Sequence, residues 1–525
     1  MTRAGGVPPP DTLDSHPYQA HAFVMINSLI AALVVAALTA GYLLATLLLV
    51  GHALLQLRLL ALARRARPSS APATALPDPL PRVTVQLPIY NERFVVERLL
   101  EHVTALRYPT ELLCIQVLDD STDDTSGLIA DWLRRRSGNG LRIAQVRRGS
   151  RAGFKAGALA EGLQRAPDGL VAVFDADFMP PPDFLERALP YFADPRTAAV
   201  QGRWTYANRT ESALTRVLGI FMDAHFLVEQ PGRTELGGFV NFNGSGGIWR
   251  TASIRRAGGW TADTLTEDLD LSYRTQLGGD RIVFDADLQV PGEIPGELSA
   301  VRVQQHRWMK GVAQNARRLL GPVLRAPVSW PIRVHACAHL LASGLYLAIA
   351  AVVVLSVPVG ALAAHGDIPR WIALNPGLAA TFLLLAPIYH EVYRREVSAS
   401  RLGFFATYVG FLMLSMSLAI HNGLAALLGY FGHRSEFVRT PKRGDATGSA
   451  SWRRSGYRSG IRPIIVIELL VWLACVSAVA RAALSGDVLL VWPTAAFTIA
   501  YAMALVVLVR ERWPARRFDR SGKAG

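Results

Sequence analysis

Long apolar segments lie on both sides of one stretch of ordinary globular composition in this chain. The first runs almost uninterrupted from Phe23 to about Val50, long enough to cross a bilayer, and continues through Leu54–Leu60. Later apolar blocks cover 334–363, 372–390, 404–429, 463–485 and 488–509. With 51% hydrophobic residues overall, the chain is typical of a membrane protein whose helical spans precede and follow a single polar domain.

Residues 82–325 combine short apolar runs with helical patterns, as a globular domain does. The runs Arg82–Leu87, Leu113–Leu118 and Val171–Phe174 predict strands, and the stretches Glu92–Leu106 and Thr125–Arg136 predict helices. This alternation predicts an α/β domain with a mainly parallel sheet that helices cover. Sites in such sheets lie at the carboxyl ends of the strands, so residues that directly follow a strand are the first candidates for chemistry.

Arginine clusters flank the apolar blocks, and the formal net charge is +14. The clusters lie at 58–67, 394–401, 453–462 and 510–517. An excess of basic residues beside spans marks cytoplasmic flanks, so we expect the N-terminus outside and the C-terminus inside. This placement argues against nucleic-acid binding. The three cysteines form no CxxC pair, so neither a disulfide framework nor a zinc site is indicated.

The block 404–429 is the exception among the apolar segments. Basic loops lie on both sides of it and both belong in the cytoplasm, so the block is expected not to cross the bilayer. It contains His421, Asn422 and several glycines, which suit a helix at the membrane interface. Five spans remain, one before the polar domain and four after it.

Three segments are candidates for binding a nucleotide. Tyr90 and Glu92 lie where a strand passes into a helix, whose N-terminal amides favour an anion or a planar base edge; an ordinary turn is the alternative. Asp119 and Asp120 open an acidic turn that holds more carboxylates than a helix cap needs, and a carboxylate accepts from a uracil-type base. Lys155 begins a helix after a glycine and can reach a phosphate, or it is simply solvated.

Asp175 and Asp177 are the sharper signal for a metal. They stand two residues apart at the end of the apolar run 171–174, so both carboxylates point to the same side. Paired carboxylates of this kind hold Mg²⁺ or Mn²⁺ together with phosphate oxygens. Such a metal neutralises charge on a departing diphosphate.

Two later stretches complete the set of candidates. Thr266-Glu267-Asp268 offers a carboxylate that can take a proton from an acceptor hydroxyl, although capping of the next helix is the simpler explanation of this stretch alone. Gln304 to Lys310 joins the flat face of Trp308 to the cations Arg307 and Lys310, which suits a sugar ring and a diphosphate. An interfacial helix with its Trp at headgroup depth is the alternative, and both can hold together.

Taken in order, these stretches resemble the motifs of family-2 inverting glycosyltransferases with the GT-A fold, and among them the processive membrane synthases of cellulose, chitin and hyaluronan. Asp119-Asp120 match the nucleotide-binding aspartates, Asp175-x-Asp177 the metal and diphosphate motif, Thr266-Glu267-Asp268 the TED motif, and Gln304-x-x-Arg307-Trp308 the QxxRW motif. The resemblance implies that Asp268, beside Glu267, is the general base. It also implies that Gln304 and Trp308 hold the acceptor sugar.

Two further segments carry the resemblance. Phe242–Arg250, FNGSGGIWR, is similar to the acceptor-side FNGTxGxWR of cellulose-synthase-like mannan synthases, with Ser245 in place of the usual Thr, and implies an acceptor contact for Asn243. Phe437–Lys442, FVRTPK, resembles the cytoplasmic gating loop FxVTxK of cellulose synthases, with Arg439 in place of the valine. It implies that Phe437, Thr440 and Lys442 belong to such a loop. The resemblance covers about 82–442.

The chain is therefore predicted to divide into eight parts. These are an extracytoplasmic tail at 1–22, a transmembrane helix with its basic flank at 23–67, a linker at 68–81, a cytosolic GT-A domain at 82–325, two transmembrane helices with an interfacial helix at 326–429, a cytosolic gating-like loop at 430–462, two transmembrane helices at 463–510, and a basic cytosolic tail at 511–525. The resemblance implies a multi-pass protein of the inner or plasma membrane with its catalytic domain in the cytoplasm.

The function implied is an inverting transfer that polymerises a β-linked glucan, mannan or glucomannan and passes it through the membrane. The partners implied are a nucleotide sugar of the UDP-glucose or GDP-mannose type, Mg²⁺ or Mn²⁺, the growing glycan and membrane lipid. Arg307 and Lys310 are expected to steady the diphosphate. Transfer of one sugar to a lipid, as in ceramide glucosyltransferase-like enzymes, and a non-catalytic membrane scaffold or transporter are the alternatives. The sequence leaves open the donor sugar, the linkage, any accessory subunit and the oligomeric state.

Overall fold

The computed structural model describes residues 16–66, 76–136, 140–433, 435, 439 and 464–512. The predicted gating-loop residues Phe437, Thr440 and Lys442 lie outside the described residues, as do most of the predicted linker and both tails. Everything below concerns the described part of the chain.

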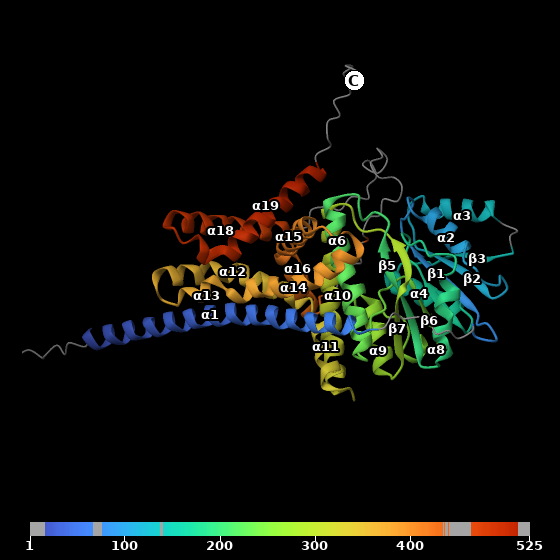
Figure 1. Cartoon of the computed structure of the whole chain (residues 1–525), viewed down its shortest axis with the longest axis horizontal. Coiled ribbons are helices and arrows are strands. Elements are labelled where there is room, and N and C mark those ends of the chain that lie inside the picture. The colour runs from blue at the N-terminus through green and yellow to red at the C-terminus, as the bar shows by residue number, and fades with distance from the viewer. Residues whose placement is uncertain are drawn as a thin grey trace, which may run out of the picture.

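A seven-stranded mixed sheet forms the centre of the polar domain (Figure 1). Its strands are β1 Val83–Ile89, β2 Leu113–Asp119, β3 Arg142–Arg147, β4 Leu170–Val173, β5 Thr197–Tyr206, β6 Gly247–Arg250 and β7 Arg281–Gly292, in the order β3-β2-β1-β4-β6-β5-β7. The first four are mutually parallel, β6 is antiparallel to both of its neighbours, and β5 pairs parallel with β7. The three predicted strands and the α/β class are confirmed.

The register brings the carboxyl ends of three strands to one edge of the sheet. Ile89 at the end of β1 pairs with Asp119 at the end of β2, and Gln86 pairs with Val173 at the end of β4. The residues that follow these strands therefore emerge side by side. This edge is where ligands bind in sheets of this kind.

Helices cover both faces of the sheet because apolar residues point to both. One buried cluster joins the sheet to α2 Val96–Thr104, α3 Thr125–Arg135 and α5 Phe184–Ala188. The other joins it to α4 Phe154–Arg165, α8 Thr251–Arg256 and α9 Glu267–Leu277. The predicted helices Glu92–Leu106 and Thr125–Arg136 correspond to α2 and α3. Between β5 and β6 the chain forms α6 Ala213–Ala224, the π-helix η2 His225–Glu229 and α7 Gln230–Glu235.

Five described helices are long and apolar enough to cross a membrane. They lie in the five predicted blocks, at Phe23–Ala63 in α1 (His16–Ala63), Gly344–His365 (α12), Arg370–Glu396 (α13 Arg370–Leu374 and α14 Pro376–Glu396), Ile464–Ser485 (α18) and Val488–Glu511 (mostly α19, Trp492–Arg512). The block expected at the interface forms α15 Arg401–Ser417 and α16 Ala419–Tyr430, which are bent by 51° at the break between them. Which helices cross, and in which direction, stays a prediction.

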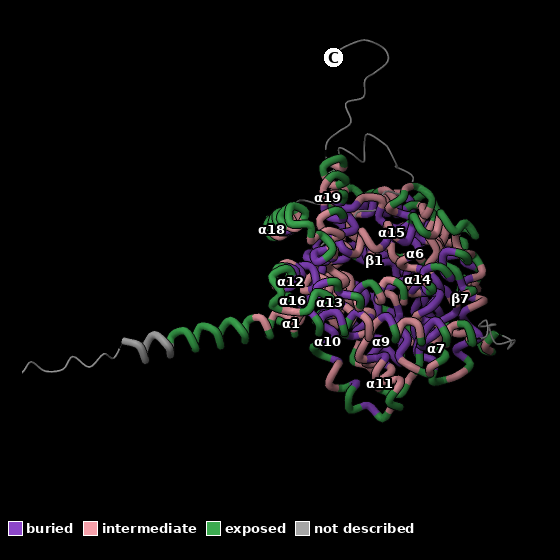
Figure 2. Tube along the Cα trace, turned by 60° about the vertical axis from the view of Figure 1, so that its left-hand side comes forward, coloured by how far each residue is buried: buried purple, intermediate pink, exposed green. Residues whose placement is uncertain are grey.

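The apolar helices project from the sheet domain and expose large hydrophobic side chains. Figure 2 shows the outer part of α1 and much of α18 as exposed, whereas the interior of the sheet domain is buried. On α1, Phe23 is 66% exposed and Leu29 61%, and on α18 Leu470 is 63% exposed. Surfaces of this kind are stable against lipid rather than water, so the helices form the membrane region of the protein.

The helix α10, Leu298–Arg325, joins the two regions and carries the QxxRW residues. Its Arg302 donates to both carboxylate oxygens of Glu468 on α18, at 2.8 and 2.7 Å. His421 of α16 and Tyr501 of α19 complete this buried group, because His421 Nδ1 lies 3.0 Å from Arg302 and Tyr501 donates to Glu468 at 2.9 Å. A buried charge inside a helical bundle needs such partners, so the group fixes α10 against three later helices.

Candidate active site

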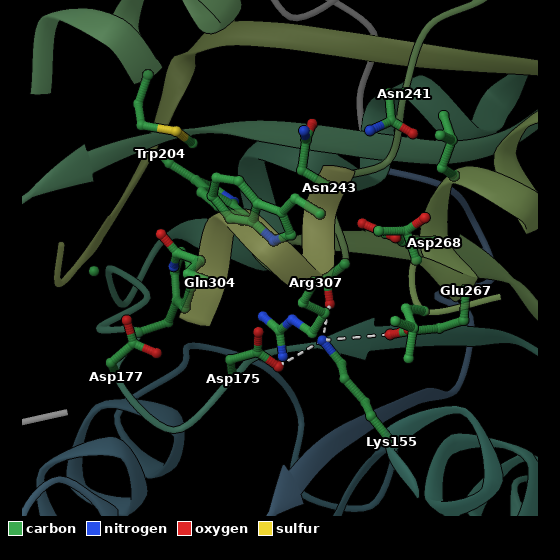
Figure 3. Close-up of a pocket in the computed structure, with 18 of the residues that line it drawn as sticks. Lys155, Asp175, Asp177, Trp204, Asn241, Asn243, Glu267, Asp268, Gln304 and Arg307 are labelled. Carbon is green, nitrogen blue, oxygen red and sulfur yellow. Dashed lines mark hydrogen bonds and ion pairs between the residues drawn. The ribbon is translucent and has the colours of Figure 1, made fainter. Parts of the chain in front are cut away.

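A cavity of about 400 Å³ lies at the carboxyl edge of the sheet, between the sheet domain and α10 (Figure 3). Segments far apart in the sequence line it. The predicted site residues among them are Tyr90, Glu92, Asp120, Lys155, Asp175, Asp177, Asn243, Glu267, Asp268, Gln304, Arg307 and Trp308. The fold thus brings twelve of the predicted residues to one cavity.

Lys155 lies among the acidic residues of this cavity. Its Nζ atom is 2.7 Å from Asp175 Oδ1 and 3.9 Å from Glu267 Oε1, and it donates to the carbonyl oxygen of Gly244 at 2.9 Å. Burial alone lowers the pKa of the ammonium, but the surrounding carboxylates outweigh it and raise the pKa above its ordinary value. Lys155 therefore offers a fixed positive charge to a phosphate.

Arg307 enters the same group of charges from α10. Figure 3 places its guanidinium beside Asp175 and Lys155. Burial lowers the pKa of Arg307, against the opposing effect of Glu267 and Asp175, yet a guanidinium remains charged in a protein. Two cations thus face one group of carboxylates.

The Asp175-x-Asp177 turn directly follows β4 and is held by backbone contacts. The amide of Asp175 donates to Ser245 Oγ at 2.9 Å, and the amide of Glu293 donates to Asp177 Oδ2 at 3.1 Å. Ser245 keeps the hydroxyl of the usual Thr, which explains why this departure is tolerated. No cluster of three or more acidic, histidine or cysteine side chains suited to a metal occurs in the described residues. The two hard carboxylates fit Mg²⁺ or Mn²⁺ only if phosphate oxygens and water complete the coordination.

Glu267 and Asp268 form the first turn of α9, where the helix dipole favours negative charge. Burial and the neighbouring Glu267 raise the pKa of Asp268 to about 7, and Lys155 opposes them. Gly244 faces this carboxylate with φ +80°, and a Cβ there would lie 3.1 Å from Asp268 Oδ2. The glycine leaves room at Asp268, whose pKa suits a general base at neutral pH.

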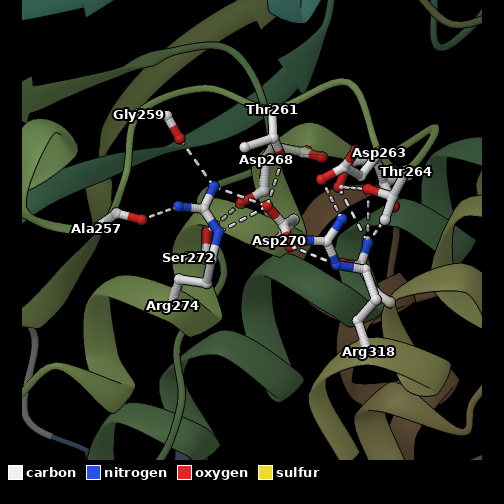
Figure 4. A network of polar contacts seen from close by, with 12 residues as sticks. Ala257, Gly259, Thr261, Asp263, Thr264, Asp268, Asp270, Ser272, Arg274 and Arg318 are labelled. Atoms are coloured by element: carbon white, nitrogen blue, oxygen red, sulfur yellow. Dashed lines mark hydrogen bonds and ion pairs between the residues drawn. The ribbon is translucent and has the colours of Figure 1, made fainter.

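A second set of contacts anchors the start of α9 from behind (Figure 4). Asp270 is fully buried and accepts from Arg274 Nε at 2.8 Å and from Thr261 at 3.0 Å. Arg274 Nη2 also donates to the carbonyl of Gly259 at 2.9 Å, and Arg318 of α10 lies 3.8 Å from Asp270. The turn that carries Asp268 is thereby tied to the sheet domain and to α10.

Helix α10 also holds the residue before α9 directly. Asn315 Nδ2 donates to Thr266 Oγ1 at 2.9 Å, and Gln314 accepts from the amide of Leu265 at 2.9 Å. Thr266 makes no side-chain cap bond to α9, so capping does not explain this residue. Gly311 abuts the same turn, since a Cβ there would lie 2.6 Å from Thr266 Oγ1 and 2.9 Å from its amide nitrogen. The QxxRW helix and the TED turn are therefore one unit.

The end of the cavity near β1 presents a flat cationic surface. The guanidinium of Arg151 lies 3.4 Å from the centre of the Tyr90 ring, and both line the cavity. Arg148 Nε donates to Asp120 Oδ1 at 2.9 Å. Sequence reasoning missed both arginines because a single basic residue in a loop carries no pattern. A stacked guanidinium and phenol suit a nucleobase.

Arg439, which replaces the valine of the gating motif, reaches this end of the cavity. Its Nε and Nη2 atoms donate to the two oxygens of Glu92 at 2.8 and 2.7 Å. Such a paired geometry is specific to arginine. Arg439, the residue that departs from the motif, is therefore held by an ion pair with Glu92.

Asp119 and Lys310 do not line the cavity. Asp119 is 1% exposed and its oxygens accept from the amide of Ser121 at 2.9 Å and from Gln145 at 2.8 Å, which fixes the turn after β2. Lys310 is 2% exposed and lies where α10 packs against Gly429 of α16. Their contacts with a nucleotide sugar stay predictions.

The side of the cavity that is predicted to bind the acceptor is lined by Trp308 and Gln304 of α10 and by Asn243. Asn243 Nδ2 lies 2.9 Å from His225 Nε2, and His225 Nδ1 lies 3.1 Å from Glu229 Oε2. His225 and Glu229 both belong to the π-helix η2, and π-helices are often found at functional sites. Sequence reasoning missed His225 and Glu229, because a His and a Glu four residues apart also occur on ordinary helix surfaces.

A second cavity, of about 270 Å³, continues from the first into the membrane region. Side chains of α1, α12, α14 and α15 line it. Glu229, Met309, His339 and Tyr389 line both cavities, so the two adjoin. The second cavity thus lies between the first cavity and the apolar helices.

Comparisons with known proteins show which family this chain belongs to. Residues 170–386 match the family model described as glycosyl transferase family group 2. Glucomannan 4-beta-mannosyltransferase 9 of Arabidopsis thaliana is 31% identical over 426 residues, which cover 76% of this chain and 76% of that protein. The chain belongs to the family of the glucomannan 4-beta-mannosyltransferases. The predicted membership in cellulose-synthase-like family-2 glycosyltransferases is confirmed.

Other matches define the extent of the likeness within this family. Glucomannan 4-beta-mannosyltransferase 2 of Arabidopsis thaliana is 42% identical over 250 residues, 47% of each chain. The chain spans about half to two thirds of the length of several such curated relatives, 47% of one and 65% of another. A mannosyltransferase of Pyrobaculum calidifontis, solved with GDP-Man and Mn²⁺, superposes with a TM-score of 0.53 at 22% identity over 76% of this chain and 100% of its own. The predicted GT-A fold is confirmed.

The pKa of Asp268 gives this family member an expected pH dependence. A base must be deprotonated, so kcat/KM for transfer should rise with pH through about 7. Glu267→Gln removes the negative neighbour that raises this pKa, and the acid limb should move to lower pH. Lys155→Met removes the cation that lowers it, and the limb should move to higher pH. Rates of transfer from pH 5 to 9 test the signs; a shift of both variants in one direction contradicts the assignment.

Proposed function

We propose that this chain is a nucleotide-sugar-dependent β-glycan synthase that transfers a hexose with inversion and extends a mannan or glucomannan chain. The observation that carries the proposal is that Lys155, Asp268 and Trp308 line one cavity. A cation for the diphosphate, a carboxylate with a pKa of about 7 and a flat aromatic face are what inverting transfer to a sugar acceptor needs.

In the proposed reaction Asp268 accepts the proton of an acceptor hydroxyl. The freed oxygen attacks the anomeric carbon from the face opposite the leaving group, the bond from that carbon to the phosphate oxygen breaks, and the nucleoside diphosphate departs. An α-linked donor thereby gives a β-linked product. Lys155 and Arg307 stabilise the negative charge that grows on the diphosphate, and Trp308 stacks against the terminal acceptor sugar.

Asp175 and Asp177 are the residues proposed to hold Mg²⁺ or Mn²⁺. Two oxygen ligands from the protein are typical of metals that bind together with substrate phosphates. When bound, the metal would neutralise charge on the leaving group. Without metal, Lys155 and Arg307 remain as the cations of the site.

GDP-mannose is the donor that we propose first, with UDP-glucose and GDP-glucose as comparators. The reason is the printed activity of relatives that align along much of this chain, glucomannan 4-beta-mannosyltransferases of Arabidopsis thaliana and Oryza sativa. The stacked Arg151 and Tyr90 accept either base, so the geometry of that end does not choose between them.

We further propose that the product moves from the first cavity into the second and out between the apolar helices. The adjoining cavities support this path. The arginine-rich flanks of the spans support a cytoplasmic catalytic domain in an inner or plasma membrane. A reporter fused after residue 525 and one before residue 1 would report on the two sides.

The decisive experiment incubates the purified full-length protein, in lipid nanodiscs, with radiolabelled GDP-mannose and Mg²⁺ or Mn²⁺. The expected product is a long polymer that endo-β-mannanase digests, and chelation of the metal should lower its yield. Label that appears only as a single sugar on a lipid would favour the lipid acceptor instead. Absence of turnover with each of the three nucleotide sugars would overturn the proposal.

A further inference from the structure

Asn243 directly precedes the glycine that faces the proposed base. A Cβ at Gly244 would lie 3.1 Å from Asp268 Oδ2, and Asn243 itself lines the catalytic cavity. The side-chain amide of Asn243 carries a donor at one end and an acceptor at the other. Its neighbours Gln230 and His225 therefore decide which end is left for a substrate in the cavity.

The orientation of Gln230 is fixed by the backbone of Asn241. Gln230 is fully buried, its Oε1 atom accepts from the amide of Asn241 at 3.1 Å, and its Nε2 atom donates to the carbonyl oxygen of Asn241 at 2.6 Å. A backbone N–H only donates and a backbone carbonyl only accepts, so the two ends of this side chain cannot be exchanged. Gln230 Nε2 also donates to Asn243 Oδ1 at 3.0 Å, which directs the oxygen of Asn243 toward Gln230.

The nitrogen of the Asn243 amide consequently faces His225. Asn243 Nδ2 lies 2.9 Å from His225 Nε2. An amide nitrogen only donates, so Nε2 is the acceptor and carries no proton. The neutral ring then has its proton on Nδ1, which lies 3.1 Å from Glu229 Oε2 and donates to it.

Glu229 is held as the acceptor that this form of the ring needs. It accepts from Arg233 Nη2 at 2.7 Å and from Gln56 of α1 at 3.0 Å. Burial alone would raise its pKa, but Arg233 and His225 bring the pKa of Glu229 well below its usual value. The carboxylate is therefore charged, and the hydrogen bond that it accepts at Nδ1 keeps Nε2 of His225 free of a proton.

These contacts use the oxygen of the Asn243 amide and one of its two N–H groups. The side chain is partly exposed at the cavity, so the second N–H is the group that it offers to a sugar oxygen. We propose that His225 and Glu229 are positioning residues, which hold the Asn243 amide with an N–H directed at the acceptor sugar beside Asp268. The inference rests on the proposed function and adds to it two residues that lie outside the recognised motifs.

The test measures kcat/KM for β-1,4-mannotetraose as acceptor, at saturating GDP-mannose, with the full-length protein in nanodiscs. His225→Gln carries an amide oxygen to the position of Nε2 and can still accept from Asn243, whereas His225→Asn reaches only the position of Nδ1. The glutamine variant should stay within about 3-fold of the original kcat/KM and the asparagine variant should lose about 10-fold, the effect of one hydrogen bond. The dissociation constant of GDP-mannose should be unchanged in both.

A double-mutant cycle separates positioning from a general structural role. Because His225 acts through Asn243, adding His225→Asn to Asn243→Ala should cause no further loss beyond that of Asn243→Ala alone. His225→Phe, which keeps the ring but has no acceptor, replaces the asparagine variant in the cycle if that variant does not fold. His102→Asn on α2, away from the cavity, is the matched control and should leave kcat/KM unchanged.

Losses that add in the double variant overturn the inference while glycosyl transfer itself stands. Equal losses in the glutamine and asparagine variants also overturn it, because the position of the acceptor atom would then not matter. Failure of the proposed function would appear separately, as no transfer by the unaltered protein to any acceptor, and would overturn the inference with it.

Discussion

Replacing Asp268 by Asn is expected to lower kcat for glycosyl transfer by about 10³-fold or more, the upper part of the range for a general base. The amide keeps the size of the side chain but cannot take the acceptor proton. Asp268 lies in the first turn of α9 at the cavity wall, whereas Lys155 and Arg307 carry the cationic contacts of the donor. The dissociation constant of the nucleotide sugar should therefore stay within about 3-fold of its original value, since neither cation is touched.

Single-turnover transfer and titration of the nucleotide sugar measure the two quantities separately. Asp263→Asn is the matched control, because Asp263 is an exposed acid in the preceding loop that pairs with Arg318 and does not line the cavity. Its loss should leave kcat unchanged, as expected for a surface ion pair. Near-normal turnover in the Asp268 variant would contradict the assignment of the base.

Asp268→Asn should also change the stability of the protein. The pKa of Asp268 is raised to about 7 in the folded chain, above the ordinary unfolded value of about 3.9, so the folded state binds the proton more tightly. The free energy of unfolding therefore falls as pH rises between about 4 and 7. Above this window the folded chain carries the full cost of keeping Asp268 ionised while buried. Asp268→Asn removes the penalty, so its thermal midpoint at pH 8 should exceed that of the original protein. Lower stability at that pH would indicate a structural role instead.

Much of the site could be predicted from the sequence because several site residues directly follow the carboxyl end of a strand. Asp120 and Asp175 follow short apolar runs, and the parallel register of β1, β2 and β4 brings them to one edge. Lys155 and Trp308 were identified by their motifs, and each lines the cavity. Local pattern and sheet topology together sufficed for these residues.

Residues that act through long-range packing could not be predicted in this way. Asn315 and Gln314 hold the TED turn from α10, and Arg302 reaches Glu468 across 166 positions. Such pairs leave no periodicity, since each partner alone resembles an ordinary polar residue on a helix. Asp119 illustrates the converse, because it matches the motif but is used to fix the turn behind the cavity.

Replacing Gly311 by Ala is expected to lower kcat by about 10²-fold, although the change is a single methyl group at a residue that does not line the cavity. A Cβ at Gly311 would lie 2.6 Å from Thr266 Oγ1, 2.7 Å from its Cγ2 and 2.9 Å from its backbone nitrogen, so the turn before Asp268 must move. The contact includes backbone, which cannot rotate away. A displacement of about 1 Å in a catalytic group typically costs this much in rate.

Gly321→Ala on the same helix is the matched control, because the Cβ there meets only the end of the Arg325 side chain, at 3.4 Å. Alanine favours a helix over glycine by about 1 kcal/mol, so the control should keep its activity and gain slightly in thermal midpoint. The Gly311 variant should still bind the nucleotide sugar, since the end of the cavity near β1 is unchanged. Full activity in that variant would mean that α10 and the TED turn tolerate a relative shift, and the two elements would then not act as one unit in catalysis.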